Sequence, residues 1–196
     1  MNFLIIIITG SPGSGKSTLA ERIAAKFRLR CVFASDILRR LQKAELEEID
    51  LDKTEKSSGF WESDEGKKYI AKRMEDESFD RKLDNELLRI IDSGDNLVVD
   101  SWTMPWLSEK GFKIWLNASA NVRAMRVSGR DAIEKEKALE RIEERNEKTA
   151  AIYKKLYGFE YGKDFSPFDL VLNTDKLNQD EVFEIVELVL RRVFSD

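Results

Sequence analysis

The stretch GSPGSGKST occupies residues 10–18 and directly follows the apolar run FLIIIIT at residues 3–9. A short, continuous run rich in isoleucine is typical of a strand buried on both faces of a parallel sheet. The glycines allow the next segment to curl so that several backbone N–H groups point inward at an anion. The stretch fits the pattern G-x-x-x-x-G-K-[ST] at every position, between an expected strand and an expected helix. It therefore predicts a site for a nucleoside triphosphate.

The chemistry of this loop gives its residues distinct roles. Lys16 is expected to bridge the β- and γ-phosphates, and Ser17 to bind Mg²⁺ through its hydroxyl. Asp100 ends the apolar run LVVD at residues 97–100 and is expected on the metal side of the site; capping of a loop is the alternative. The residues expected to bind ATP are Gly10, Ser11, Pro12, Gly13, Ser14, Gly15, Lys16, Ser17 and Thr18.

Strand-like and helix-like segments alternate along the rest of the chain. Further strands are expected at residues 30–34, 97–100, 112–118 and 168–174, with amphipathic helical segments between them and at the C-terminal end. Ser35 or Asp36 is expected to cap the helix that follows the second strand. The polar segment 44–79 is expected to be an insertion with two helices flanking a loop at 57–59, and 131–157 a charged helical stretch. The fold class is therefore α/β, a doubly wound five-stranded parallel sheet flanked by helices in a single domain.

Composition excludes several classes of function. The 196 residues include no histidine and one cysteine, Cys31, so imidazole chemistry and an internal disulfide are excluded and a catalytic thiol is not expected. The net charge of −4 argues against a broad nucleic-acid surface. No apolar run approaches the roughly 20 residues that span a bilayer, and the N-terminal run lacks the features of a signal peptide. We expect a cytoplasmic protein without membrane association, whose oligomeric state is unknown, with a monomer slightly favoured.

Arginine spacing narrows the kind of triphosphate-binding protein. The base-reading N-K-x-D of GTPases and the L-S-G-G-Q segment of transporters are both missing from the sequence. Arg123, Arg126 and Arg130 share one helix face, and Arg141 and Arg145 share another. Phosphoryl transfer needs cations around the moving group and exclusion of water, which a hinged, arginine-bearing flap supplies. The pattern favours a small kinase in which Arg126 and Arg130 are catalytic; a solvated salt-bridge helix is the alternative.

A second group of residues is suited to the acceptor. Arg39 and Arg40 follow the second expected strand by one helical turn, and an arginine fork suits the acceptor's phosphate. Asp36, just upstream, is expected either to contact the acceptor's sugar or base or to cap the helix. The expected substrate is a small-molecule nucleotide.

Longer motifs carry a family resemblance over most of the chain. They are the opening segment IIITGSPGSGKSTLAERIA, SDILR at 35–39, FDRKLDNELL at 79–88, KIWLNASANVRAMRVSGRD at 113–131, and LYG at 156–158 followed by SPFDLVLNT at 166–174. The sequence resembles the nucleoside monophosphate (NMP) kinases, most closely the archaeal-type cytidylate kinases.

This resemblance implies a P-loop NTPase fold and ATP-dependent, Mg²⁺-assisted phosphorylation of CMP or dCMP. It also implies a CORE (about 1–43, 80–125 and 158–196), an NMP-binding insertion (about 44–79) and a LID (about 126–157). Arg39 matches the acceptor-phosphate arginine and Arg126 and Arg130 match LID arginines, with Arg141 and Arg145 as substrate-binding residues on the far side of the lid.

Two departures from the family pattern concern the acceptor. ASDILR lacks the glycine that the family usually carries there, and Ser101 and Trp102 stand where the family often has Gly-Arg. Trp102 is expected either to stack on the acceptor's base or to fill the core beneath the insertion. Two alternatives follow: a kinase for another NMP or a small metabolite, and a catalytically weak ATP-binding module acting on a protein or RNA partner.

Overall fold

The computed structural model describes residues 4–43, 49–50, 53–56, 59–61 and 63–194. Its centre is a five-stranded sheet of order β2-β3-β1-β4-β5 in which every neighbouring pair is parallel. The sheet confirms the α/β fold expected from the sequence. The strands are β1 (Ile5–Thr9), β2 (Arg30–Phe33), β3 (Leu97–Asp100), β4 (Phe112–Asn117) and β5 (Leu170–Asn173).

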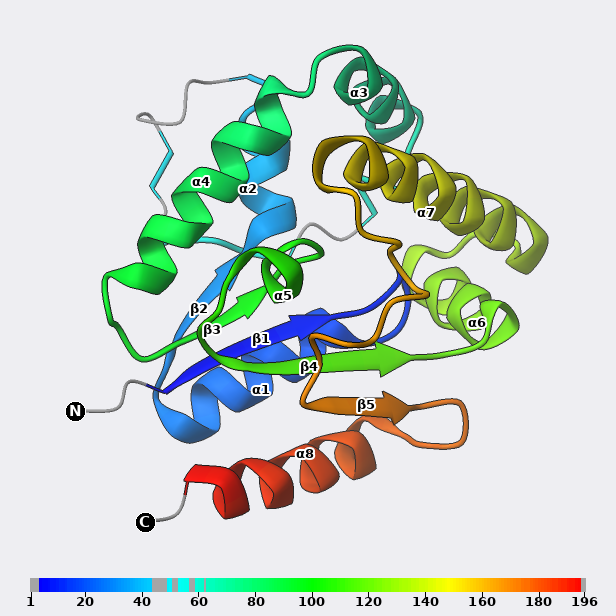
Figure 1. Ribbon diagram of the computed structural model, residues 1–196. Coiled ribbons are helices and arrows are strands. Elements are labelled where there is room, and N and C mark those ends of the chain that lie inside the picture. Colours follow the sequence, from blue (N-terminus) through cyan, green and yellow to red (C-terminus); the bar gives the residue numbers. More distant parts are fainter. Residues whose placement is uncertain (1–3, 44–48, 51–52, 57–58, 62, 195–196) are drawn as a thin grey trace.

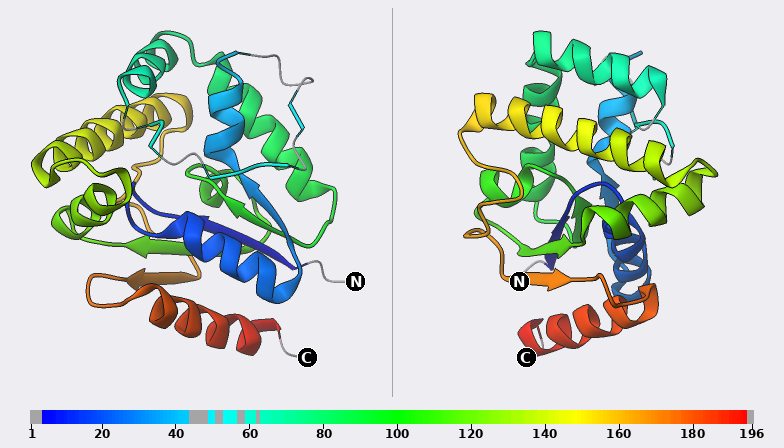
Figure 2. Two further views of the ribbon diagram at one scale, coloured as in Figure 1. Left: turned by 180° about the vertical axis from the view of Figure 1, so that it is seen from behind. Right: turned by 90° about the vertical axis from the view of Figure 1, so that its right-hand side faces the viewer.

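Helices cover both faces of this sheet (Figures 1 and 2). Side chains of β1 alternate between two cores, because successive residues of a strand point to opposite faces. Ile5 and Ile7 pack with α2 (Ala34–Arg40) and α4 (Ser78–Asp92), whereas Ile6 and Ile8 pack with α1 (Lys16–Phe27) and α8 (Gln179–Phe194). The other helices are α3 (Asp64–Glu75), α5 (Met104–Leu107), α6 (Ala120–Asp131) and α7 (Lys135–Tyr157).

Some local boundaries differ from the sequence-based expectation. Helix α2 begins at Ala34 with Phe33 as its N-cap, so Ser35 and Asp36 lie inside the first turn instead of capping it. The charged stretch near 131–157 is divided, because Ala132 takes a left-handed conformation with φ 53° and ends α6, and α7 begins at Lys135 with Glu134 as its N-cap. The short helix α5, with a proline in its first turn, was not anticipated.

The insertion between α2 and α4 is only partly described. Helix α3 is one of the two helices expected around residues 57–59, and 57–58 themselves lie outside the described residues. Residues 49–50 and 53–56, on the other side, are not helical, and 44–48 and 51–52 are not described. Within the described ranges, no helix is both long and apolar enough to cross a membrane.

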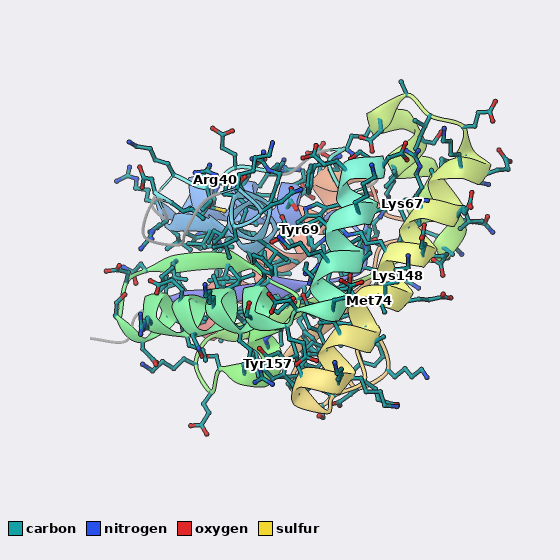
Figure 3. All side chains as sticks on the ribbon, turned by 90° about the horizontal axis from the view of Figure 1, so that it is seen from above. Arg40, Lys67, Tyr69, Met74, Lys148 and Tyr157 are labelled. Carbon is teal, nitrogen blue, oxygen red and sulfur yellow. The ribbon has the colours of Figure 1, made fainter. Side chains whose placement is uncertain are left out.

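Helix α3 of the insertion lies along α7, as Figure 3 shows from above. Glu144 of α7 forms an ion pair with Lys67 of α3 at 2.7 Å and another with Lys148 of its own helix at 2.7 Å. Arg141 of α7 and Asp64 of α3 form a longer pair at 3.6 Å. Ion pairs therefore link the segments expected to form the NMP-binding insertion and the LID. The division of the chain into these subdomains stays a prediction.

Candidate active site

The glycine-rich loop joins the carboxyl end of β1 to the first turn of α1 and is held in place by α6. Gly13 has φ 82°, and a Cβ there would lie 2.7 Å from the carbonyl oxygen of Arg123 in α6. The Arg123 guanidinium in turn donates to the Pro12 carbonyl at 3.4 Å. Glycine at position 13 thus satisfies both a left-handed backbone and a close approach by another helix.

Within this loop Ser14 is buried, and its hydroxyl has no hydrogen-bond partner among the described residues. Buried polar atoms are nearly always paired, so an unpaired one needs an explanation. The N-terminal end of α1, where backbone N–H groups lack helical partners, follows immediately. An anion bound in the loop would satisfy both features at once.

Ser17, in the first turn of α1, and Asp100, the last residue of β3, meet beside the carboxyl ends of β1 and β3. The Ser17 hydroxyl donates to an Asp100 carboxylate oxygen at 2.5 Å, and Asp100 is 3 % exposed. Burial raises the pKa of Asp100, while the nearby Lys16 charge and the Ser17 hydrogen bond oppose that rise. The described residues contain no group of three or more acidic, histidine or cysteine side chains that could bind a metal. One hydroxyl and one carboxylate fit Mg²⁺, which takes few protein ligands and is completed by substrate phosphates and water.

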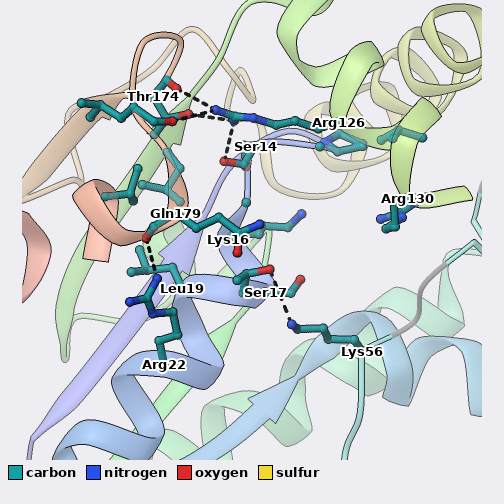
Figure 4. A pocket seen from close by; sticks show the side chains of 18 of the residues that line it. Ser14, Lys16, Ser17, Leu19, Arg22, Lys56, Arg126, Arg130, Thr174 and Gln179 are labelled. Atoms are coloured by element: carbon teal, nitrogen blue, oxygen red, sulfur yellow. Dashed lines mark hydrogen bonds between the residues drawn. The ribbon is translucent and has the colours of Figure 1, made fainter. Parts of the chain in front are cut away.

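A cavity of about 600 Å³ opens over the glycine-rich loop (Figure 4). Its volume is in the range of small-molecule and cofactor sites. The loop between β5 and α8 and the first turn of α8 form one wall, with Leu177 and Val182 as apolar surface. Cationic side chains from separate parts of the chain also line it: Lys16, Arg22, Lys56, Arg126, Arg130 and Arg145.

Arg126 joins two walls of this cavity. Its guanidinium donates to the Ser14 carbonyl at 3.3 Å, to the Thr174 hydroxyl at 3.0 Å and to the Thr174 carbonyl at 2.7 Å. Burial lowers the pKa of Arg126. These bonds connect the phosphate loop to the loop that follows β5. Arg130, one helical turn further along α6, lines the cavity and pairs with Asp131 at 2.6 Å.

Arg145 connects the large cavity to a second, smaller one. The second cavity, about 30 Å³, shares Ser35, Trp61 and Arg145 with the first. The Arg145 guanidinium lies over the rings of Trp61 and Trp102, 5.1 and 5.4 Å from their centroids. The other residues that line the smaller cavity are Ala34, Leu38, Arg73, Leu83, Asp100, Ser101, Trp102, Thr103, Thr149 and Tyr153.

Trp102 is 7 % exposed and packs within an aromatic cluster. Its ring stacks on Tyr161 with centroids 4.5 Å apart and an interplanar angle of 8°. Lys16 Nζ lies over the same ring at 5.9 Å from the centroid. The residue therefore fills core space and also borders the smaller cavity; its stacking on a nucleotide base stays a prediction.

The remaining residues expected to bind the acceptor do not line either cavity. Asp36 is fully buried and forms ion pairs with Arg39 and Arg40. Its carboxylate also accepts a hydrogen bond from the backbone N–H of Glu55 at 3.1 Å. The Arg39 side chain is 39 % exposed. Arg141 is directed to Asp64 in α3. Their roles toward an acceptor stay predictions.

Sequence reasoning missed three cavity-lining residues of the insertion, Lys56, Trp61 and Arg73. Arg73 is 2 % exposed and forms a two-point ion pair with Asp80, at 3.0 and 2.6 Å. A tryptophan isolated in a highly charged segment was the available signal for Trp61. Lys56 and Arg73 had no such signal, because lysine and arginine are frequent throughout that segment.

Comparisons with solved structures agree on the fold. A shikimate kinase from Bacteroides thetaiotaomicron is similar with a TM-score of 0.55 and 18 % identity, covering 97 % of this chain and 98 % of that one. The protein TT1252 from Thermus thermophilus is similar with a TM-score of 0.59 and 15 % identity over the full length of both chains. At these identities the likeness concerns the fold alone.

Sequence comparisons reach further. A cytidylate kinase of Sulfurisphaera tokodaii is 36 % identical over 190 residues, covering 95 % of each chain. A cytidylate kinase of Methanocaldococcus jannaschii is 35 % identical over 188 residues, covering 93 % of this chain and 95 % of that one. The model of the cytidylate kinase-like family matches residues 5–176, which include the phosphate loop, the insertion and the arginine-bearing helices. The chain therefore belongs to the cytidylate kinase-like family.

Proposed function

We propose that the protein transfers the terminal phosphoryl group of ATP to CMP or dCMP, giving CDP or dCDP and ADP. The observation that carries this proposal is the unpaired Ser14 hydroxyl in a loop that opens onto a 600 Å³ cavity lined by cations. Family membership and the cytidylate kinases among its relatives support the choice of acceptor.

ATP would lie in the large cavity with its phosphates on the loop at residues 10–18. The base would lie against Leu177 and Val182, in the wall that Arg126 ties to the phosphate loop. This gives Arg126 a positioning role beside the catalytic one expected from the sequence. Bound Mg²⁺, held by Ser17 and Asp100, would neutralise charge on the β- and γ-phosphates.

The acceptor would approach from the side of the smaller cavity, which shares Arg145 with the larger one and would have to widen beyond its present 30 Å³ to admit a nucleotide. One of its phosphate oxygens attacks the γ-phosphorus, and the bond from that phosphorus to the β–γ bridging oxygen breaks as ADP leaves. No general base is required, because the acceptor's phosphate is already ionised at neutral pH. Lys16, Arg130 and Arg145 would stabilise the charge on the moving phosphoryl group. Arg39 would release its ion pair with Asp36 and bind the acceptor's phosphate instead.

Helices α3 and α7 would exclude water from this reaction. Water competes with the acceptor for the phosphoryl group, so the site must be covered when ATP reacts. The ion pairs that join α3 to α7, Lys67 with Glu144 and Asp64 with Arg141, support movement of the insertion and the lid as one cover.

The test is ADP release measured in a coupled assay with CMP, dCMP, UMP and AMP as acceptors. We expect turnover with CMP and dCMP, loss of turnover in Lys16→Ala, a raised acceptor KM in Arg39→Ala, and mainly a lowered kcat in Arg126→Ala. Preference for UMP, AMP or another small acceptor would replace the proposed substrate. Tight ATP binding without turnover on any acceptor would favour a module that acts on a protein or RNA partner.

A further inference from the structure

One short segment of the insertion, residues 53–56, is fixed against the end of β2. The Thr54 hydroxyl accepts from the Phe33 backbone N–H at 2.9 Å, and Arg40 donates to the Lys53 carbonyl at 2.9 Å. The Glu55 N–H donates to the buried Asp36 carboxylate. The last residue of this segment is therefore held at a defined place beside the phosphate loop.

That residue, Lys56, extends its side chain into the large cavity (Figure 4). Its Nζ lies 3.5 Å from the hydroxyl of Thr18, in the first turn of α1, and forms an ion pair with Glu21 one turn later. The ammonium is also near enough to the metal-side carboxylate of Asp100 to lower its pKa, against the larger effect of burial. Lys56 thus places a positive charge at the phosphate end of the cavity from outside the phosphate loop.

The ion pair with Glu21 can be exchanged at little cost. The Lys56 side chain is 33 % exposed and that of Glu21 is 46 % exposed. Ion pairs in such positions contribute little to stability, because water and salt screen them. A nucleotide phosphate is a stronger partner, since it carries more charge and several acceptor oxygens.

We propose that Lys56 is a second phosphate-binding lysine, which leaves Glu21 and contacts the phosphates of ATP beside Thr18. The inference rests on the nucleotide site described under the proposed function and adds a residue to it. Because Lys56 belongs to the insertion, its contact with ATP links occupancy of the triphosphate site to the position of the segment that covers the acceptor. Glu21 competes with the phosphates for the ammonium and so weakens ATP binding in the wild-type protein.

The test compares Lys56→Met, Glu21→Gln and the double variant with wild type, measuring the Kd of ATP by calorimetry without acceptor. Lys56→Met should weaken ATP binding about 10-fold, the loss expected for one hydrogen bond to a charged group. Glu21→Gln should tighten it, because Lys56 no longer has a competing partner, and the double variant should resemble Lys56→Met. Lys53→Met is the matched control: this lysine lies in the same segment, has an 84 % exposed side chain, and should leave the Kd unchanged.

A purely structural bond between the insertion and α1 predicts a different result. Both single variants would then weaken ATP binding together and lower the free energy of unfolding in urea, and that outcome overturns the proposal. An unchanged Kd in Lys56→Met, or no ATP binding by wild type, overturns it as well. Wild type is assayed in parallel for ADP release with CMP, which separates the role of Lys56 from the proposed reaction. If Lys56→Met weakens ATP binding and Glu21→Gln tightens it, but CMP is not turned over, only the proposed reaction is rejected.

Discussion

Asp84 of α4 gives the stability of the protein a specific dependence on pH. The residue is 3 % exposed, and its carboxyl group accepts hydrogen bonds from the Thr103 hydroxyl at 2.6 Å and the Tyr157 hydroxyl at 2.7 Å. Burial raises the pKa of Asp84 from its ordinary 3.8 to about 7, with the two hydroxyl donors opposing the rise and Asp80 adding to it. Near pH 6 the folded protein therefore holds a proton that the unfolded chain has released.

The sign and size of the effect follow from this difference. Between pH 4 and pH 7 the unfolded state binds fewer protons at this site than the folded state, so the free energy of unfolding falls as pH rises. The pKa of Asp84 differs by about three between the two states, and a difference of one corresponds to about 1.4 kcal/mol, so the free energy of unfolding falls by about 4 kcal/mol in total. Asp84→Asn keeps an acceptor at this position and removes the titration.

We therefore expect the stability of wild type, measured relative to Asp84→Asn, to fall by about 4 kcal/mol from pH 4 to pH 8. Urea unfolding followed by circular dichroism at several pH values gives both free energies. Thr103→Val should enlarge the fall, because Thr103 makes the strongest opposing hydrogen bond. Ile91→Val, a core truncation in the same helix, should cost about 1 kcal/mol at every pH. A difference between wild type and Asp84→Asn that stays constant with pH would refute the reasoning.

Three other substitutions test separate features. Gly13→Ala forces a Cβ to 2.7 Å from the Arg123 carbonyl oxygen at a left-handed φ, so it should weaken ATP binding at least 10-fold with α6 displaced; an unchanged Kd in calorimetry would contradict this packing. Asp80→Asn leaves the Arg73 guanidinium buried without its charge partner and should lower the free energy of unfolding by about 3–5 kcal/mol in urea titration; a loss below about 1 kcal/mol would mean that the pair is solvated. Lys16→Ala should abolish phosphoryl transfer and leave the free energy of unfolding, measured in urea, within about 0.5 kcal/mol of wild type; a large loss of stability would assign Lys16 a structural role instead.

The features that could be predicted from the sequence are those encoded by neighbouring residues. An isoleucine run followed at once by glycines, Lys16 and Ser17 contains both the buried strand and the phosphate loop, so β1, α1 and their junction were predictable. Asp100 could be placed at the same sheet edge because parallel strands end together, and its contact with Ser17 agrees with that placement. Strand positions followed from apolar runs, and the alternation with helices implied parallel pairing.

Contacts between distant segments could not be predicted in this way. The partners of Arg145 come from the insertion and from the end of β3, and no periodicity relates Trp61 to Trp102. Asp36 carried two interpretations in the sequence, and its burial with two arginines depends on how residues 53–56 fold back onto α2. The break at Ala132 was hidden because the charge pattern continues across it.

The same placement of Arg145 over two indole rings gives the protein an intrinsic optical signal. Indole emission responds to a neighbouring positive charge and to water. A ligand that draws the guanidinium away from Trp61 and Trp102 will change the fluorescence of both. In a Trp106→Phe/Trp115→Phe background these two are the only emitting indoles of the chain's four. Stopped-flow records of that emission would then time nucleotide arrival without any attached dye.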